Sequence, residues 1–509
     1  MPSPAQAPVP ARPTASAPAP SSPPDQAPSP SPDPAAESPA PPTALRRSTL
    51  LVLCACVMVA QSMVAAINLL IPQLGSSGLH PSASEVLWTV DAYVIVFAGL
   101  LIPAGALGDR HGHKGALLSG LGLFAAGATV SALAGSPALL IAGRGVSGAG
   151  AALIMPATMS ILMRLAPPEQ RPRALASWTL AMGLGGLAGN VGGGLVGEYL
   201  SWRALFWVML PLGALLAVAV ARAIPRTDKA VGAAVPSLDP LGTLLLTSGL
   251  VAVLFGIIES PMYGWGAPRI LCAFAAGAVL LAAFTAHALR SRAPLFDPRV
   301  FRSARLRAAS LGTAASFFGL FALFYVNSQY LQYVKGYGAA QAGFAIVPLT
   351  VGMALVPRLA ARWSGSPRPV VGGGLLLIGA GLLGASTADA GTPYAAYVCW
   401  LLVISAGTGL CLPALTMGVV TSLPPHQAGL GSGLSTSARE IGAALGVAVT
   451  GTVLAAHTGT GHAGATSDFT SGMAVALRVV GVVVVVAAGV VAAGLGRASS
   501  SSGSSPSGV

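Results

Sequence analysis

Long apolar stretches recur along almost the whole chain, and they constrain its fold more than any other feature. A helix that crosses a bilayer must satisfy its own backbone hydrogen bonds, and it needs roughly 20 mainly apolar residues to do so. With 54% hydrophobic and only 8% charged residues, against about 25% charged residues in soluble domains, the sequence predicts an all-α polytopic membrane protein. Fourteen segments are long and apolar enough to span: 49–71, 86–107, 116–134, 138–162, 174–198, 204–223, 240–258, 269–289, 308–331, 340–362, 370–387, 393–418, 434–456 and 473–496.

The basic residues predict the orientation of these spans. An even number of spans places both termini on one side of the membrane. If that side is the cytoplasm, 21 of the 27 lysines and arginines lie in the tails and loops there or at the span ends that adjoin them. Only Arg203, Arg269 and Lys335 lie on the other face, and Arg144, Arg439 and Arg478 lie within spans. The positive-inside rule therefore predicts cytoplasmic termini in a plasma (inner) membrane. Topology and contact with anionic lipid also account for the net charge of +12, so no nucleic acid partner is implied.

Both ends of the chain are polar extensions. Residues 1–42 hold 16 of the 41 prolines, and no basic-then-apolar signal precedes Arg46, so we expect residues 1–45 to form a disordered cytoplasmic tail. The serine-rich residues 497–509 are expected to form a second one. All five cysteines fall inside apolar runs without metal-ligand spacing, so neither a disulfide framework nor a metal site is expected.

One stretch in the first half, "GALGDRHGHKGAL", crowds charge and glycine between two apolar runs. It resembles the loop signature of the major facilitator superfamily, Gly-x-Leu-x-Asp-Arg-x-Gly-x-basic-x-x-Leu. The positions that carry the resemblance are Gly105, Leu107, Asp109, Arg110, Gly112, Lys114 and Leu117. This resemblance implies a conformational latch. We expect Asp109 to meet the positive N-terminus of a neighbouring helix, and Arg110 and Lys114 to pair with acids or helix C-termini across the interface between two halves.

Other motifs follow in the order typical of the fourteen-span drug:proton antiporter branch of that family, over residues 45–496. "LIAGRGVSGAGAA" resembles the fourth-helix motif and places Arg144 inside a span. "GGLAGNVGGG" resembles the antiporter signature through Gly185, Gly189, Gly193 and Gly194, with Asn190 in place of the usual proline. These glycines predict close helix packing, with a role in preventing leak as the alternative.

The resemblance also implies the domain organisation. Facilitators consist of two six-helix bundles around a site at the membrane midplane. We expect these bundles at residues 46–225 and 306–496, with a linker at 226–305 that carries two extra central helices. The stretch "PRLAARWSGSPRP" resembles a decayed second latch, with Ala361 where the carboxylate would stand.

Ionisable residues inside spans are costly and usually functional, so the few present are the candidates for proton coupling. Asp91 is the first candidate for the proton carrier, the alternative being an interfacial residue that caps its helix or binds water. Arg144 would tune a neighbouring carboxylate or bind an anionic group. Glu440, beside Arg439, is either a second proton site or an internal ion pair near the cytoplasmic side.

The first span departs from the family pattern. Many members of the branch carry an acid a few residues before an Asn-x-x-x-Pro run, and here that run is "NLLIP" while the acidic position holds Met63. If that acid serves cationic substrates, this protein prefers neutral or anionic ones.

The ninth span is unusually aromatic. "FFGLFALFYVNSQYLQYV" holds seven of the chain's 30 aromatic residues. Phe321, Tyr325 and Gln329 are expected to line a substrate cavity, because ligand pockets combine apolar walls with a few polar anchors. An interfacial aromatic belt is the alternative, and it would account for Tyr330, Tyr333 and Tyr337.

Together these features predict a secondary exporter that moves small apolar or amphiphilic compounds outward as protons enter. The alternatives are transport of one dedicated metabolite, outward or inward, and a non-transporting sensor. Neither His-Glu-x-x-His nor Gly-x-x-x-x-Gly-Lys-[Ser/Thr] occurs in the sequence, so enzymatic activity, ATP and metals are not expected. We expect the proton motive force to supply the energy, the bilayer to surround the protein, and the protein to be a monomer.

Overall fold

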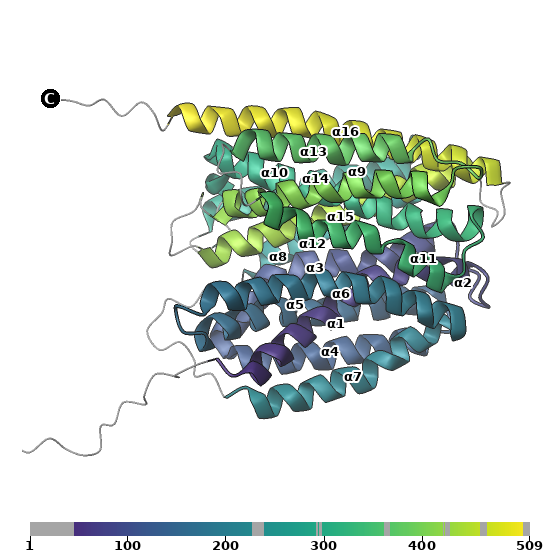
Figure 1. Ribbon diagram of the computed structural model, residues 1–509. Helices are drawn as coiled ribbons and strands as arrows, with labels where there is room; N and C mark the ends of the chain where they lie inside the picture. The colour runs from purple at the N-terminus through teal and green to yellow at the C-terminus, as the bar shows by residue number, and fades with distance from the viewer. Residues whose placement is uncertain are drawn as a thin grey trace, which may run out of the picture. The chain divides into compact units, whose positions relative to one another are not determined.

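The computed structural model describes residues 45–225, 239–291, 294, 298–360, 367–420, 422, 428–458 and 466–501. The first half contains α1 (Arg47–Leu69), α2 (Ile71–Gly75), α3 (Ala83–His111), α4 (His113–Ala132), α5 (Pro137–Leu165), α6 (Arg171–Tyr199), α7 (Trp202–Ala223), α8 (Pro240–Tyr263) and α9 (Pro268–Arg290). The rest contains η1 (Pro298–Arg302), α10 (Ala304–Gln329), η2 (Tyr330–Val334), α11 (Ala339–Ala345), α12 (Val347–Ala360), α13 (Pro367–Ala385), α14 (Tyr394–Val420), α15 (Ala428–Thr458) and α16 (Thr466–Ser501) (Figure 1).

The number of spans agrees with the sequence. Over the described ranges, 14 helices are long and apolar enough to cross a membrane, and no strand is present. The predicted all-α membrane fold is confirmed. Residues 1–44 of the expected N-terminal tail, the start of the linker at 226–238 and the decayed latch at 361–366 lie outside the described residues. Helix α16 continues to Ser501, past the expected boundary at residue 496.

Two spans are interrupted. The first ends at Leu69, and after Leu70 the short α2 begins with Pro72 in its first turn, where the missing N–H of proline is tolerated. The tenth is divided at Ile346 into α11 and α12. The ninth ends in the π-helical turn η2. These breaks lie where the helices of opposite halves of the chain meet.

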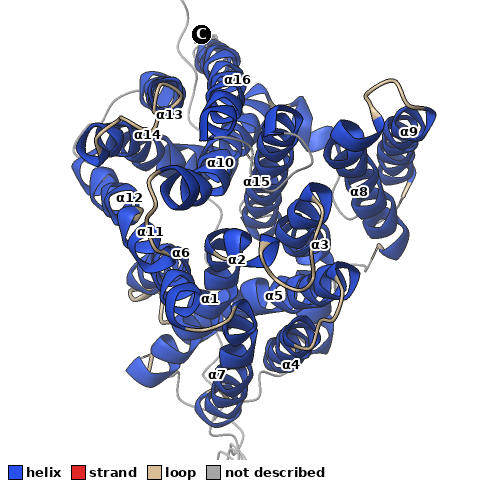
Figure 2. Ribbon diagram, turned by 90° about the vertical axis from the view of Figure 1, so that its right-hand side faces the viewer, coloured by secondary structure: helices blue, strands red, loops and turns tan. Residues whose placement is uncertain are grey.

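The helices pack as two groups that follow each other along the chain. In the first group α3 and α4 both pack against α5, α1 packs against α6, and α4 packs against α7. In the second group α10 packs against α15 and α16, and α13 packs against α14 and α16. Figure 2 looks along the helices and shows α8 and α9 beside these groups, with α8 against α3 and α15 and α9 against α8.

The two groups, called the N-bundle (α1–α7) and the C-bundle (α10–α16) from here on, contact each other through α1 with α10, α3 with α15 and α6 with α11. Ser328 Oγ donates to the carbonyl of Asn68 at 2.7 Å, and Gln332 Nε2 donates to the carbonyl of Leu69 at 3.2 Å. The Ala340 N–H donates to Glu198 Oε2 at 3.4 Å. All of these bonds lie at the end of the bundles opposite the start of α1 and the end of α16, and that end is called the joined end below.

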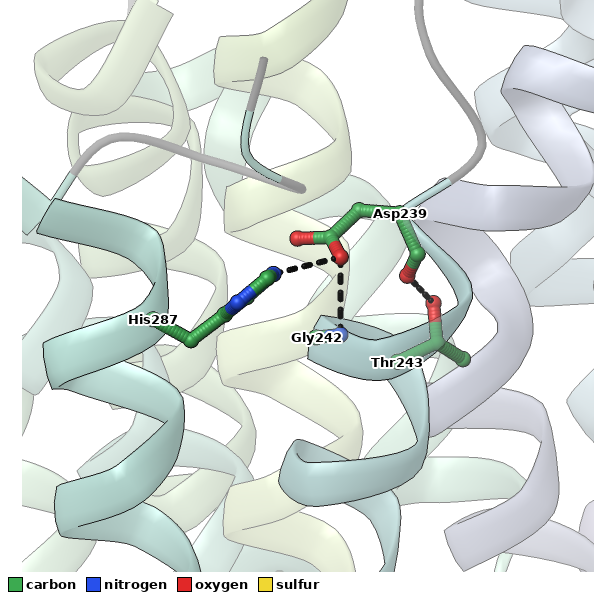
Figure 3. A network of polar contacts seen from close by, with 4 residues as sticks. All are labelled: Asp239, Gly242, Thr243 and His287. Carbon is green, nitrogen blue, oxygen red and sulfur yellow. Dashed lines mark hydrogen bonds and ion pairs between the residues drawn. The ribbon is translucent and has the colours of Figure 1, made fainter. Parts of the chain in front are cut away.

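A polar contact fixes the base of the α8–α9 hairpin at the other end (Figure 3). Asp239 caps α8, since its Oδ1 accepts from the Gly242 N–H at 2.8 Å and its backbone carbonyl accepts from Thr243 Oγ1 at 2.8 Å. His287 Nε2, from the last turn of α9, lies 2.8 Å from the same Oδ1. The cap thus also ties the two helices together.

Candidate transport site

Asp91 is a fully buried carboxylate without a partner. It lies on α3 with 0% of its surface exposed, and neither Oδ1 nor Oδ2 has a hydrogen-bond partner in the described structure. An unpaired charge in an apolar surrounding is costly to keep, and protonation would remove it. The chemistry available to this side chain is therefore the gain and loss of a proton.

The start of α3 is capped by other residues. Ser82 Oγ accepts from the Glu85 N–H at 3.3 Å, and Glu85 Oε2 accepts from the Ser82 N–H at 2.8 Å, which forms a capping box. The suggestion that Asp91 caps its helix is therefore wrong, because the helix begins eight residues earlier and Ser82 occupies the cap position.

Arg144 is a buried cation held by backbone carbonyls. Its side chain on α5 is 0% exposed, Nε donates to the carbonyl of Thr89 at 3.0 Å, and Nη1 donates to the carbonyl of Met63 at 3.2 Å. Its Cζ lies 4.7 Å from the ring centroid of Tyr93, and Nη2 has no described partner. Among the described residues Arg144 forms no ion pair with a carboxylate. This conformation therefore does not support the expectation that Arg144 adjusts the proton affinity of a neighbouring acid.

The α3 tyrosine next to these groups was not selected from the sequence. Tyr93 is 0% exposed, its hydroxyl donates to the carbonyl of Ala60 at 2.7 Å, and the Cζ of Arg144 lies 4.7 Å from the centroid of its ring. It therefore ties α3 to α1 and faces the buried cation of α5. Its position two residues after Asp91 in "WTVDAY" was the available signal.

Arg439 and Glu440 form a pair in the middle of α15. Arg439 Nε donates to Glu440 Oε1 at 3.0 Å, and Nη2 lies 3.0 Å from the same oxygen. Glu440 is 3% exposed and borders a cavity of about 20 Å³ between α3, α8 and α15, which is on the scale of one water molecule. The expected ion pair between Arg439 and Glu440 is present, further from the start of α15 than expected. A role for Glu440 in proton transfer stays a prediction.

The aromatic residues of α10 divide between packing and the centre of the protein. Phe321 is half-buried, and its ring contacts those of Phe317 and Phe324 at centroid distances of 6.1 and 5.6 Å. Tyr325 is buried, with 5% of its surface exposed. Gln329 is buried, and its Nε2 donates to the carbonyl of Tyr325 at 3.0 Å.

Asn327 of α10 and Tyr330 of η2 have structural contacts. Tyr397 Oη donates to Asn327 Oδ1 at 2.9 Å, which ties α14 to α10. Tyr330 is 0% exposed, and its hydroxyl donates to the carbonyl of Asp389 at 2.8 Å. An interfacial belt therefore does not account for Tyr330, whereas Tyr333 is 48% exposed. The lining of a cavity by Phe321, Tyr325 and Gln329 stays a prediction.

Asp109 at the end of α3 and Lys114 at the start of α4 bind partners within the N-bundle. Asp109 Oδ1 lies 3.0 Å from His113 Nε2 and 3.6 Å from Arg164 Nη2 of α5. Lys114 Nζ donates to the carbonyl of Ala221 at 2.8 Å and to that of Ile224 at the end of α7. The expected contact of a cation with a helix C-terminus is present. The contacts of Asp109 and Lys114 with other described side chains and carbonyls lie within the N-bundle, and residues 423–427, which precede α15, lie outside the described residues.

The remaining latch positions shape the turn. Gly112 has a φ of +100° between α3 and α4, a conformation that glycine adopts readily and other residues rarely do. Gly105 packs against Pro156 of α5. Arg110 is exposed. The loop is thus a compact connection whose cation, Lys114, ties α4 to α7.

The glycines of α6 face two different partners. Gly185, Gly189 and Gly193 lie against the backbone of α1, where an added Cβ would collide with Met58, Ser62 and Ala66 respectively. Gly194 lies against the carbonyl of Ala339 at the start of α11, and the backbone carbonyl of Asn190 lies against Gly343 of the same helix. Asn190 Nδ2 donates to the carbonyl of Gly186 in its own helix at 3.0 Å. One face of the motif therefore packs within the N-bundle, and the other closes on the C-bundle.

The sequence matches the model of the Major Facilitator Superfamily over residues 51–447, most of the chain. This chain belongs to the major facilitator superfamily. The family predicted from the loop and helix motifs is thus confirmed, and the chain is a multi-pass membrane protein with a transporter fold.

Similar facilitators are resistance and export proteins. Over 389 residues the chain is 33% identical to the tetracenomycin C resistance and export protein of Streptomyces glaucescens, covering 75% of this chain and 71% of that one. Over 405 residues it is 34% identical to a cephamycin export protein of Amycolatopsis lactamdurans, covering 77% and 81%. A solved POT family transporter in complex with 5-aminolevulinic acid shares the fold, with a TM-score of 0.64 at 14% identity over 88% of this chain and 96% of that one.

Proposed function

We propose that this facilitator exports small apolar or amphiphilic compounds, antibiotics among them, in exchange for protons, and that Asp91 carries the proton. The relatives named above export or confer resistance to antibiotics. The observation that carries the proton assignment is the isolation of Asp91, whose two carboxylate oxygens are buried without a partner in the described structure. Asp91 lies on α3, the N-bundle helix that packs against α15 of the C-bundle. A carboxylate between two moving bundles can meet each side of the membrane in turn.

The proposed orientation places both termini in the cytoplasm of a bacterial-type inner membrane. The excess of lysine and arginine on that side supports it. The joined end, where Ser328 and Gln332 bond to α1, would then face outward, so that this conformation is closed to the outside. Protons entering with one charge across ~100 mV would release ~2.3 kcal/mol, enough for roughly a fifty-fold gradient.

The site favours neutral or anionic amphiphiles. Met63 stands where the branch commonly has an acid, and its carbonyl is used to hold Arg144. The Nη2 of Arg144 is left over as a donor, while Phe321 and Tyr325 supply apolar surface on the C-bundle. These groups suit a compound with ring systems and an acceptor or anionic substituent.

A second candidate function is the export of one dedicated metabolite. Three similar proteins are each named for a single compound: tetracenomycin C, methylenomycin A or cephamycin. A broad panel separates the two functions, because a multidrug exporter responds to several unrelated compounds and a dedicated one responds to a single chemical class.

The test uses inside-out vesicles that carry a preformed pH gradient. Added substrates should dissipate the gradient through the intact protein but not through Asp91→Asn, which keeps the size of the side chain and cannot carry the proton. Asp468→Asn is the matched control, because Asp468 is an exposed carboxylate in the first turn of α16. Glu440→Gln tests the second candidate. Dissipation that persists in Asp91→Asn but vanishes in Glu440→Gln would transfer the carrier role to Glu440, and no response to any compound would contradict export by antiport.

A further inference from the structure

A groove runs along the α8–α9 hairpin beside α3, where Thr247 packs against Gly99 and the ring of Phe255 lies 6.4 Å from that of Trp88. It has a volume of about 320 Å³ and is lined by Thr247, Ser248, Val251, Ala252 and Phe255 of α8 and Ala273 of α9. Both helices are candidate membrane spans, and α9 lies at the periphery with α8 as its main neighbour (Figure 2). The groove therefore opens to the hydrocarbon of the bilayer.

An arginine lies at one end of this groove. The guanidinium Cζ of Arg269, in the first turn of α9, is 4.0 Å from the ring centroid of Tyr263 and 5.9 Å from that of Phe255. Arg269 is exposed, and no described carboxylate pairs with it. The acid in the same region, Glu259, accepts a hydrogen bond from Trp88 Nε1 at 3.1 Å.

The same end carries the residues typical of a membrane interface. Tyr263 is 40% exposed and Trp265 is 58% exposed, and Trp265 stacks on Phe274 with centroids 6.3 Å apart. Tyrosine and tryptophan gather at the depth of the lipid headgroups. From Phe255 to Thr247 the groove descends about 12 Å along α8, a large part of the roughly 15 Å of one leaflet's hydrocarbon.

We propose that this groove is a binding site for an anionic glycerophospholipid of the leaflet at the joined end. One acyl chain lies between α8 and α9 against Val251, Ala252 and Ala273, and the phosphate binds the Arg269 guanidinium. The charge of Arg269 complements the phosphate, and its place directly beside Phe255 makes the polar and apolar parts of the site continuous.

A second arginine at the joined end provides a matched comparison. Arg203 also stacks on an aromatic ring, with its Cζ 4.3 Å from the ring centroid of Trp202. Its Nη2 donates to the carbonyl of Ala134 at 2.9 Å, and it does not border the groove. Arg203 is half-buried, whereas Arg269 is exposed. If any arginine at this depth bound the lipid, the two residues would behave alike.

The test is native mass spectrometry of the full-length protein with phosphatidylglycerol or phosphatidylcholine of identical chains. The intact protein should retain phosphatidylglycerol more tightly, Arg269→Gln should weaken that binding by roughly fivefold, and Arg203→Gln should leave it unchanged. Ala273→Leu, which fills the groove, should weaken the binding of both lipids.

Equal retention of the two lipids by the intact protein would overturn the proposal, as would equal losses in the two arginine variants. Unchanged lipid binding in Ala273→Leu would also overturn it. If Arg269→Gln does not fold, the comparison of the two lipids and the Ala273→Leu variant still decide the question. Because none of these measurements depends on transport, their failure is distinct from a failure of the proposed export.

Discussion

Arg144 on α5 donates a hydrogen bond of 3.2 Å to the backbone carbonyl of Met63 on α1. The position where the branch commonly carries an acid thus still contacts the fourth-span arginine, but through its main chain. A buried cation is costly unless hydrogen bonds satisfy it, and here carbonyls and the Tyr93 ring do so. The positive charge of Arg144 is therefore stabilised by backbone carbonyls and a ring, and not by a described carboxylate. Asp91, on the neighbouring helix, forms no hydrogen bond with it.

This arrangement predicts that Arg144→Lys is not a conservative change. A lysine keeps the charge, but its compact ammonium cannot bond both Thr89 and Met63 while stacking on Tyr93. We expect a loss of about 1–3 kcal/mol in the free energy of unfolding, measured as a lower thermal midpoint in detergent. Arg478→Lys, at an exposed position on α16, should cause little change, and equal shifts in the two variants would contradict the role given to the carbonyls.

The α6 glycine motif predicts a difference between neighbouring glycines. A Cβ at Gly189 would collide with the backbone carbonyl of Ser62, which cannot move without shifting α1, whereas a Cβ at Gly192 meets nothing within 4 Å. Gly189→Ala should therefore destabilise the protein by about 1–3 kcal/mol. Gly192→Ala should be neutral or slightly stabilising, because alanine favours helices. Thermal unfolding of the two variants checks this, and a larger effect at Gly192 would refute the packing described for α1 and α6.

Gly194 predicts an effect on conformation more than on folding. An added methyl group would press on the Ala339 carbonyl of the opposite bundle, so Gly194→Ala should shift the protein towards a state in which the joined end is open. The reporter is Ser328→Cys, buried at that end, labelled by a membrane-impermeant maleimide. Labelling should be several-fold faster with Gly194→Ala than with Gly192→Ala, and equal rates would exclude α6 and α11 as a closing surface.

The loop between α3 and α4 predicts that its two cations differ. Lys114 bonds the last carbonyls of α7, whereas Arg110 is exposed. Lys114→Met should lower the free energy of unfolding by about 1 kcal/mol, since the ammonium is only half-buried. Arg110→Gln should leave stability nearly unchanged. The reverse order in thermal midpoints would show that the α7 contact is unimportant.

Much of the fold could be predicted because the bilayer sets the length of each span. All fourteen segments expected from apolar runs correspond to helices. The breaks at Leu70 and Ile346 were not predicted, because an apolar run shows its length but not where two helices within it separate. The position of Pro72 was the one signal for the first of them.

The sequence identified the charged residues of the candidate site but not their hydrogen-bond partners. Asp91 and Arg144 are conspicuous as charges in apolar runs, yet nothing in the sequence shows that Arg144 binds carbonyls on α1 and α3. The carbonyl of Ala221, which accepts from Lys114, lies 107 residues away in the chain. We expected Lys114 to pair with a group of the opposite bundle, but this acceptor lies on α7 of its own bundle. Backbone acceptors are the same at every position, so only the folded chain identifies them.

The most direct test of the central claim separates substrate binding from proton coupling. In proteoliposomes, the protein with Asp91→Asn should still exchange labelled for unlabelled substrate across the membrane at no pH gradient, because the bundles and the cavity residues are unchanged. The same variant should fail to accumulate substrate when a pH gradient is imposed, whereas the intact protein should do both. Gradient-driven accumulation by Asp91→Asn would contradict the assignment of Asp91 as the proton carrier.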